Sequence, residues 1–239
     1  MRTQRTDAYA TGGAGSSGAA GTGSGGAVRP RLPARARATA AGRAARPAPP
    51  TVRDLRERSG RGPRALTFAP GDLVVVSGLP GSGKSTLIAR AAQGRGIDSQ
   101  DARERWEHRM PAALPYAVYR PLARLAHYAG LRRALRSGEP VVVHDCGTQA
   151  WVRRWLAREA ARRGRRLHLL LLDVTPRTAR QGQRDRGRGV SGYAFARHRR
   201  AVGRLVGDAE RGILPAGCAS ATLLDRPAAS ALRRIAFDG

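Results

Sequence analysis

The chain has 239 residues, and its 44 Lys and Arg residues outnumber its 17 Asp and Glu residues, which gives a formal charge of +27. No apolar run approaches the roughly 18 residues that a membrane-spanning helix needs, and the start of the chain lacks the apolar core of a secretory signal. Two cysteines are too few for a disulfide framework, so we expect a cytoplasmic protein. Two explanations of the basic excess stay open: nucleic-acid binding, or codon drift toward Arg in a GC-rich gene.

The first part of the chain differs in composition from the rest. It is rich in Gly, Ala, Arg and Pro and holds too few large apolar residues to offset the entropy of ordering a backbone. We therefore expect residues 1–65 to be a disordered basic tail that attracts acidic partners non-specifically. Residues 66–239 are then of a suitable size for one domain. Whether the tail belongs to the natural protein stays open, since a valine codon such as that of Val52 can serve as an initiator.

From Asp72 onward, short apolar runs alternate with helical patterns. The expected strands are "DLVVVSG", a brief strand near Ile97, "EPVVVHDCG", "LHLLLLDV" and "ASATLLD". Helical patterns follow at residues 84–93, after the strand near Ile97 up to residue 135 with a break at 110–115, and at residues 149–164, 176–189, 191–206 and 227–237. Strands that alternate with helices predict right-handed crossovers and an α/β fold, with a parallel sheet covered on both faces.

The segment "VVVSGLPGSGKST" (residues 74–86) fits the phosphate-binding pattern G-x-x-x-x-G-K-[ST] between a strand and a helix. Its glycines allow backbone N–H groups to point at phosphate oxygens, and the helix adds its positive N-terminal end. Lys84 is the only lysine of the chain, because a slim ammonium reaches β- and γ-phosphates from inside a tight loop and a planar guanidinium does not. Ser85 would bind Mg²⁺. The residues expected to bind ATP are Gly78, Leu79, Pro80, Gly81, Ser82, Gly83, Lys84, Ser85 and Thr86.

The rest of the chain separates the classes of protein that share this loop. A GTPase normally reads guanine with N-K-x-D, which a chain with one lysine cannot contain. A remodelling ATPase of the AAA+ class has an Asp-Glu pair at a strand end and a further helical domain, whereas "VVVHDCGT" has no Glu after Asp145. Small phosphotransferases combine the loop with acids at neighbouring strand ends and an Arg-rich lid. This sequence holds all three features.

Acidic side chains follow two of the expected strands, at the edge of the sheet where ligands bind. Asp98 and Asp101 come just after the second strand, where a carboxylate can orient an acceptor hydroxyl and take its proton. Capping of the next helix is the alternative for both. Asp145 ends the third strand and would hold Mg²⁺ through water, with a buried ion pair as the alternative. Arg103 would pair with a negative group of the acceptor or with a neighbouring Glu.

The segment "RTARQGQRDRGRG" is the expected lid. Arg177, Arg180, Arg184 and Arg188 recur at spacings of three and four, on one helical face. Arginines brought in by a closing segment stabilise the charge on a transferring phosphoryl group, and Arg184 and Arg188 are the two that we expect to do so. A solvated Arg face is the alternative.

In order along the chain, "GLPGSGKST", "DSQDAR", "VVVHDCGTQAWVRRWLA", "LHLLLLDVTP" and "RDRGRGVSGYAFARHRR" resemble the AAA_33-type kinases. These P-loop proteins of the AAA family ATPases are related to phage polynucleotide kinase, gluconate kinase and the zeta toxins, and the resemblance runs from Leu73 to about Phe237. It implies a P-loop NTPase three-layer sandwich with a five-stranded parallel sheet in the order 2-3-1-4-5, binding of ATP and Mg²⁺, and phosphoryl transfer to a hydroxyl. In the polynucleotide kinases the catalytic base is the Asp of D-x-x-R. Here Gln100 stands at that position, Asp98 and Asp101 flank it, and Arg103 is preserved.

The sequence thus favours a kinase that transfers the γ-phosphate of ATP to a hydroxyl of a nucleic acid 5′ end, a nucleoside, a sugar acid or another small molecule. The long segment between the second and third strands would form the acceptor side, where Tyr116, Tyr119 and Tyr128 stack on a ring or pack under the lid. Gln100 favours a different reading, a non-catalytic or regulatory ATP-binding module. The charge favours a third, a nucleic-acid-binding protein with an ATPase domain.

Overall fold

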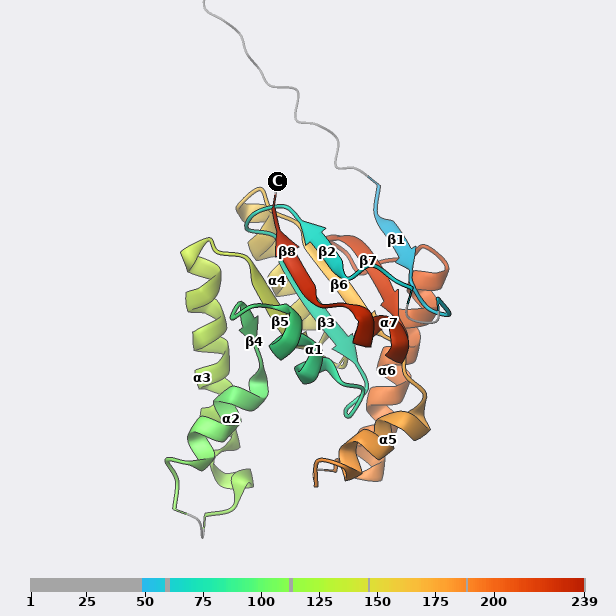
Figure 1. The fold of residues 1–239 in the computed structure, drawn as a ribbon. Helices are drawn as coiled ribbons and strands as arrows, with labels where there is room; N and C mark the ends of the chain where they lie inside the picture. The colour runs from blue at the N-terminus through green and yellow to red at the C-terminus, as the bar shows by residue number, and fades with distance from the viewer. Residues whose placement is uncertain (1–48, 59–60, 112–113, 146, 188, 239) are drawn as a thin grey trace, which may run out of the picture. The chain divides into compact units, whose positions relative to one another are not determined.

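The computed structural model describes residues 49–238 except 59–60, 112–113, 146 and 188. The expected disorder of residues 1–48 lies outside the described part. Within that part, strands pair in parallel in a six-stranded sheet of order β1-β7-β6-β3-β5-β4 (Figure 1). Its strands are β1 (Thr51–Asp54), β3 (Leu73–Gly78), β4 (Gly96–Ile97), β5 (Val141–Asp145), β6 (Leu167–Leu172) and β7 (Cys218–Leu224).

Helices connect these strands, and a second, two-stranded parallel sheet pairs an early strand with the last one. The helices are α1 (Lys84–Ala91), α2 (Ser99–Glu107), α3 (Tyr116–Ser137), α4 (Ala150–Arg162), α5 (Pro176–Arg184), α6 (Gly192–Glu210) and α7 (Arg226–Ala231). The small sheet consists of β2 (Ala65–Phe68) and β8 (Arg234–Phe237). In the described part of the chain, no helix combines the length and the apolar character needed to cross a membrane.

Alternate residues of the central strands face opposite sides of the large sheet, as the pleat requires. Val75 of β3 belongs to a buried cluster with side chains of α3, α4 and α6. Its neighbours Val74 and Val76 belong to a second cluster with side chains of α1, α7, β2 and β8. The sheet is therefore the middle of three layers, which confirms the predicted α/β fold. Continuous apolar runs form its central strands because both of their faces are buried.

The predicted order of five strands is confirmed. In chain order the expected strands are β3, β4, β5, β6 and β7, and along the sheet they lie as β4-β5-β3-β6-β7, which is the order 2-3-1-4-5. The predicted number of five is wrong, because β1 pairs with β7 and adds a sixth strand. β1 lies within the segment expected to be disordered, so ordered structure begins before residue 65. Its side chains are mostly exposed, and a strand of this kind shows no apolar alternation in the sequence.

Contacts just after β1 attach it to the domain. Leu55 is 1% exposed and joins the cluster around α1. Arg56 forms ion pairs with Asp54, Asp173 and Glu210, with N–O distances of 2.6, 2.7 and 2.7 Å. The guanidinium thus joins the edge strand to the ends of β6 and α6, and the hydrogen bond to Asp54 is the main cause that raises the pKa of Arg56. These contacts join segments far apart in the sequence.

Candidate functional site

The phosphate-binding loop lies between the end of β3 and the start of α1, at the carboxyl edge of the sheet. The loop curls through Gly81 and Gly83, whose φ angles of 86° and 99° suit glycine. Lys84 is 3% exposed, and its Nζ donates to the carbonyl oxygens of Gly78 at 2.8 Å and Leu79 at 2.7 Å. The loop therefore encloses its ammonium group inside main-chain oxygens and holds it in place before any ligand binds.

The same loop offers donors that no described residue uses. Ser82 Oγ is buried and has no hydrogen-bond partner among the described residues. The N-cap residue of α1, Gly83, provides no side-chain cap, and no acidic residue stands in the first turn of the helix. The positive end of α1 is thus uncompensated by a side chain of that turn. An ammonium group, an orphan hydroxyl and a helix N-terminus at one place fit a polyphosphate.

Asp145 ends β5 directly beside the loop strand, in register with Ser77 of β3. Its Oδ2 accepts from Arg153 Nη1 of α4 at 2.6 Å and from Ser77 Oγ at 3.3 Å. The carboxylate and the guanidinium are each 6% exposed in their side chains, so the buried ion pair named above as the alternative is present. Both bonds use Oδ2, and no bond of Oδ1 to a described residue is found. No group of three or more His, Cys, Asp or Glu side chains fit to hold a metal occurs among the described residues.

Asp98, the first candidate base, follows β4 directly and is 7% exposed. Its Oδ1 lies 3.6 Å from Nδ1 of His144, which precedes Asp145 on β5. Burial, and then the charge of Lys84, lowers the pKa of His144 to about 4, although Asp98 and Asp145 oppose the shift. His144 is therefore uncharged near neutral pH. Of the predicted acids, the structure brings Asp98 and Asp145 to this edge.

Two other predicted residues lie on α2. Arg103 Nε donates to Glu107 Oε1 at 2.6 Å, an i,i+4 ion pair on the helix. This is the neighbouring-Glu arrangement that the sequence left open beside an acceptor contact. Asp101 and Gln100 belong to α2, but their side chains lie outside the described residues, so their candidate roles stay predictions.

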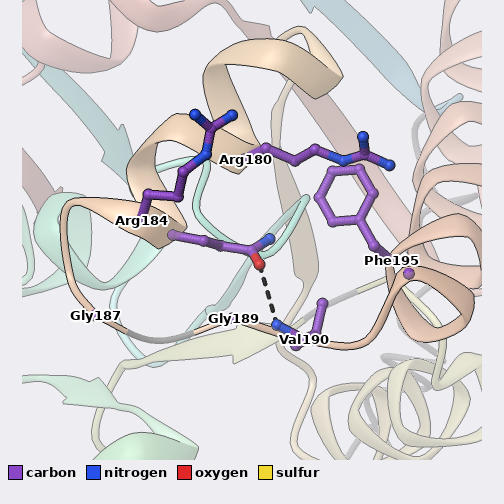
Figure 2. Close-up of a pocket in the computed structure, with 8 residues that line it drawn as sticks. Arg180, Arg184, Gly187, Gly189, Val190 and Phe195 are labelled. Atoms are coloured by element: carbon purple, nitrogen blue, oxygen red, sulfur yellow. Dashed lines mark hydrogen bonds between the residues drawn. The ribbon is translucent and has the colours of Figure 1, made fainter.

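The expected lid forms α5 and contacts the phosphate-binding loop. Gln183 Nε2 donates to the carbonyl oxygen of Pro80 at 2.9 Å. The Oε1 atom of the same side chain accepts from the Val190 N–H at 3.1 Å (Figure 2). A Cβ on Gly182 would lie closer than 3.0 Å to the carbonyl oxygen of Gly81. The backbone of α5 at Gly182 thus lies against the backbone of the loop at Gly81, and this contact leaves no room for a side chain on Gly182.

The lid arginines divide between several contacts. Arg180 and Arg184 line a cavity of about 360 Å³ between α5 and α6 (Figure 2). The Arg180 guanidinium lies 4.8 Å from the centre of the Phe195 ring. Arg186 Nη2 donates to Thr86 Oγ1 at 2.9 Å, which joins the end of the lid to α1. Arg188, predicted to act with Arg184, lies outside the described residues.

Arg153 and Gln183 are site residues that the sequence did not single out. Both lie on the buried face of a helix: Arg153 on α4 with Leu156 and Ala157, and Gln183 four residues after the buried Ala179. A charged or amide side chain within an apolar stripe must find a buried partner. A polar residue at a buried position of the helical pattern was therefore the sequence signal for both residues. At Arg153 the many other arginines of the chain obscured this signal.

The chain was compared with curated proteins and with solved structures. No curated protein matches the chain significantly. A crystal structure from Chloroflexus aurantiacus J-10-fl, of a protein whose assignment as a kinase is provisional, is 16% identical and covers 65% of this chain and 85% of that chain with a TM-score of 0.44. The tunicamycin resistance protein of Deinococcus radiodurans is 14% identical and covers 58% of this chain and 82% of that chain with a TM-score of 0.37. Similarity this low carries no argument about the site.

The match to a protein family is more extensive. The AAA domain described by the AAA_33 model aligns with residues 73–206, more than half of the chain. The matched range begins with β3, contains the phosphate-binding loop and the lid, and ends within α6. This agrees with the resemblance read from the sequence, and the chain belongs to the AAA_33 family of P-loop AAA domains.

Proposed function

We propose that the protein is an ATP-dependent phosphotransferase that moves the γ-phosphate of ATP to a hydroxyl of an acceptor. The observation that carries the proposal is the buried Lys84 ammonium, held by the carbonyl oxygens of Gly78 and Leu79 inside the loop. These two bonds hold the ammonium group inside the loop, which supports its proposed contact with the β- and γ-phosphates of ATP. ATP then exchanges carbonyl oxygens for phosphate oxygens around a charge that is already in place.

Magnesium would be held by oxygen ligands of the same edge. The Ser85 hydroxyl and the Oδ1 atom of Asp145, the latter through water, are the hard oxygen donors that Mg²⁺ prefers. The pair with Arg153 uses Oδ2 alone, which supports this assignment. Magnesium supplies positive charge on the phosphate oxygens when it is bound.

Asp98 is the proposed base. In the transfer, the acceptor oxygen forms a bond to the γ-phosphorus, its proton passes to the Asp98 carboxylate, and the bond from the γ-phosphorus to the bridging oxygen breaks. ADP leaves with the electron pair of that bond. His144 is uncharged near neutral pH, so it forms no ion pair that would neutralise the carboxylate. Arg184 and Arg188 would approach the migrating group from the lid.

The test is transfer of labelled γ-phosphate from ATP into a mixed pool of hydroxyl compounds. We expect Lys84→Ala and Lys84→Arg to abolish labelling, because neither keeps a slim ammonium in the loop, and Asp98→Asn to abolish it without loss of ATP binding. Arg133→Gln, on the exposed side of α3, is the matched control and should label as the wild type does. Labelling that survives Asp98→Asn and disappears in Asp101→Asn would assign the base to Asp101 instead.

A regulatory ATP-binding module is the second candidate, and two observations favour it. Gln100 replaces the Asp of the polynucleotide kinase pattern, and Asp145 is engaged in a buried ion pair with Arg153. In that case ATP binding or hydrolysis changes a contact with a partner and no acceptor is labelled. Release of free phosphate by the wild type, with every acceptor unlabelled, decides for this candidate.

A further inference from the structure

A second cavity, of about 610 Å³, lies between α3, the first turn of α4 and α6. Its wall includes Arg124 and Tyr128 of α3, Gln149 and Trp151 at the start of α4, and Arg197 and Arg204 of α6. Its volume lies within the range of about 300–1,000 Å³ that is typical of small-molecule sites. The roles described above leave this cavity without an occupant.

The charge of the wall is positive from several sides. Of the described residues, three with guanidinium groups line it and none with a carboxylate does. Arg197, Ala201 and Arg204 share one face of α6 at i, i+4 and i+7, so the small Ala201 leaves space between two guanidiniums. Among the described residues, no carboxylate within 4.0 Å forms an ion pair with Arg124, Arg197 or Arg204.

The start of α4 adds to this charge. Its N-cap residue Gln149 makes no side-chain capping bond, and the first turn holds no acid. The Gln149 side chain makes no cap because its Oε1 accepts a hydrogen bond from the Tyr128 hydroxyl of α3 at 2.6 Å. The positive end of α4 thus stays uncompensated by a side chain of its first turn, next to the three arginines. Such a wall fits an anionic group.

The same wall carries two aromatic rings. The ring centres of Tyr128 and Trp151 lie 5.3 Å apart at an angle of 53°, and the Gln149 bond fixes the tyrosine. Trp151 is 51% exposed, although large aromatic side chains are usually well covered. An exposed indole face beside a cationic cavity offers a stacking surface for a planar ring.

The cavity is close to the phosphate-binding loop. Gly147, which precedes the wall residues Thr148 and Gln149, approaches both other parts of the site: a Cβ placed on it would meet Val202 of α6 at 2.8 Å and Ser77 Oγ at 3.5 Å. Ser77 adjoins Gly78, the first residue of the loop, and bonds Asp145. The wall of the cavity is therefore joined through Gly147 and Ser77 to the groups proposed to hold ATP.

We infer that this cavity binds a ligand that carries an anionic group beside a planar ring, the chemistry of a nucleoside monophosphate. The ligand's role as phosphoryl acceptor rests on the proposed function, whereas its binding does not. The same chemistry occurs in a free mononucleotide and at the 5′-phosphorylated end of a nucleic acid strand.

Calorimetric titration of the full chain tests the inference, with the loop site saturated by a non-hydrolysable ATP analogue and Mg²⁺. The probes are the four ribonucleoside monophosphates, the matching nucleosides, ribose 5-phosphate, and a 5′-phosphorylated trinucleotide. We expect at least one monophosphate to bind about tenfold or more tightly than its nucleoside, which lacks the charge, and than ribose 5-phosphate, which lacks the ring. Binding of the trinucleotide alone would identify the strand end as the source of the same chemistry.

Variants assign the binding to this cavity. Arg204→Gln and Trp151→Leu should each weaken binding of the monophosphate about tenfold or more. Two control variants should leave monophosphate binding unchanged. Arg133→Gln removes an arginine that lies outside the wall, and Tyr193→Leu removes an aromatic residue that is 81% exposed elsewhere.

Two results would overturn the inference: no probe binds, or Arg204→Gln and Trp151→Leu bind the monophosphate as tightly as the wild type does. Equal binding of ribose 5-phosphate and the monophosphate would refute the ring contact. These outcomes are separate from the test of the proposed function. Label transfer to another acceptor with no monophosphate bound leaves the phosphotransferase standing, while monophosphate binding without any transfer leaves the cavity assignment standing.

Discussion

Gly182→Ala in α5 is the substitution that best tests how the lid meets the phosphate-binding loop. Two effects of opposite sign act on it. Alanine favours a helix over glycine by about 1 kcal/mol, which alone would raise the free energy of unfolding. The new Cβ, however, would lie closer than 3.0 Å to the carbonyl oxygen of Gly81. This neighbour is a backbone atom and cannot rotate away, so α5 or the loop must shift, and overpacking of this kind costs about 1–3 kcal/mol.

Gly203→Ala in α6 is the matched control. Gly203 is exposed in the middle of its helix, and a Cβ there meets nothing within 4 Å. The control therefore keeps the helix-propensity gain and lacks the clash. We expect the control to gain about 1 kcal/mol and Gly182→Ala to lose between about 0 and 2 kcal/mol, a difference of about 1–3 kcal/mol between the two variants.

Urea unfolding at 25 °C, followed by circular dichroism, measures this difference. Calorimetry with ATP and Mg²⁺ is the second measurement, because a displaced loop presents its amides and Lys84 less favourably to phosphate. Gly182→Ala should therefore bind ATP more weakly than the control. If both variants gain stability equally and bind ATP as the wild type does, the lid does not press on the loop and the reasoning fails.

Three further predictions concern buried groups. The pKa of His144 is lowered from 6.5 to about 4, so the unfolded chain takes up the proton first as the pH falls. The free energy of unfolding should therefore be full above pH 6.5 and decline by up to about 3 kcal/mol toward pH 4. Urea unfolding across this pH range should show a smaller decline in His144→Gln than in the wild type. Arg153→Met leaves Asp145 buried without its cation and should cost about 3–5 kcal/mol in denaturant unfolding, part of which Asp145→Asn restores in the double variant. Burial raises the pKa of the Cys218 thiol to about 11, so in a Cys146→Ser background it should react with a disulfide reagent at pH 8 far more slowly in the native state than in urea.

The parts of the fold that the sequence predicted depend on short-range pattern. The loop between residues 78 and 85 is read from fixed positions, and the strands beside it are apolar runs that only a sheet buried on both faces explains. Their parallel pairing follows from alternation with helices, and their order from the family resemblance. These features need no knowledge of distant contacts.

The parts that were missed depend on distant contacts. β1 has mostly exposed side chains, and it is ordered by pairing with β7 and by the ion pairs of Arg56 to Asp173 and Glu210. The stretch 227–237, expected to be one helix, divides into α7 and β8, because Arg234–Phe237 pairs with β2 far upstream. Local propensity is a weak guide where tertiary pairing decides.

The site shows the same division. Lys84 is where the motif places it, and Asp98 and Asp145 reach the expected edge. At Asp145 the sequence favoured a metal ligand and kept a buried ion pair as the alternative. Arg153 provides the ion pair from α4, and no pattern near Asp145 reveals which of the many arginines would reach it. The cavity beside α4 is likewise assembled from three helices. Its residues become a site only once the fold brings them together.

We expect nucleotide binding at Lys84 to change the protonation of His144, the neighbour of the proposed base. The charge of this ammonium is one cause of the low pKa of His144, which lies 3.6 Å from Asp98. Phosphate oxygens would neutralise that charge, so the pKa of His144 should rise toward 6.5 when ATP binds. By linkage, binding of ATP below pH 6.5 should then be accompanied by uptake of a fraction of a proton. ATP should also bind more tightly as the pH falls toward the raised pKa of His144. Calorimetry in buffers of different ionisation heat measures the proton uptake, and an uptake that is the same in His144→Gln would show that another group takes the proton.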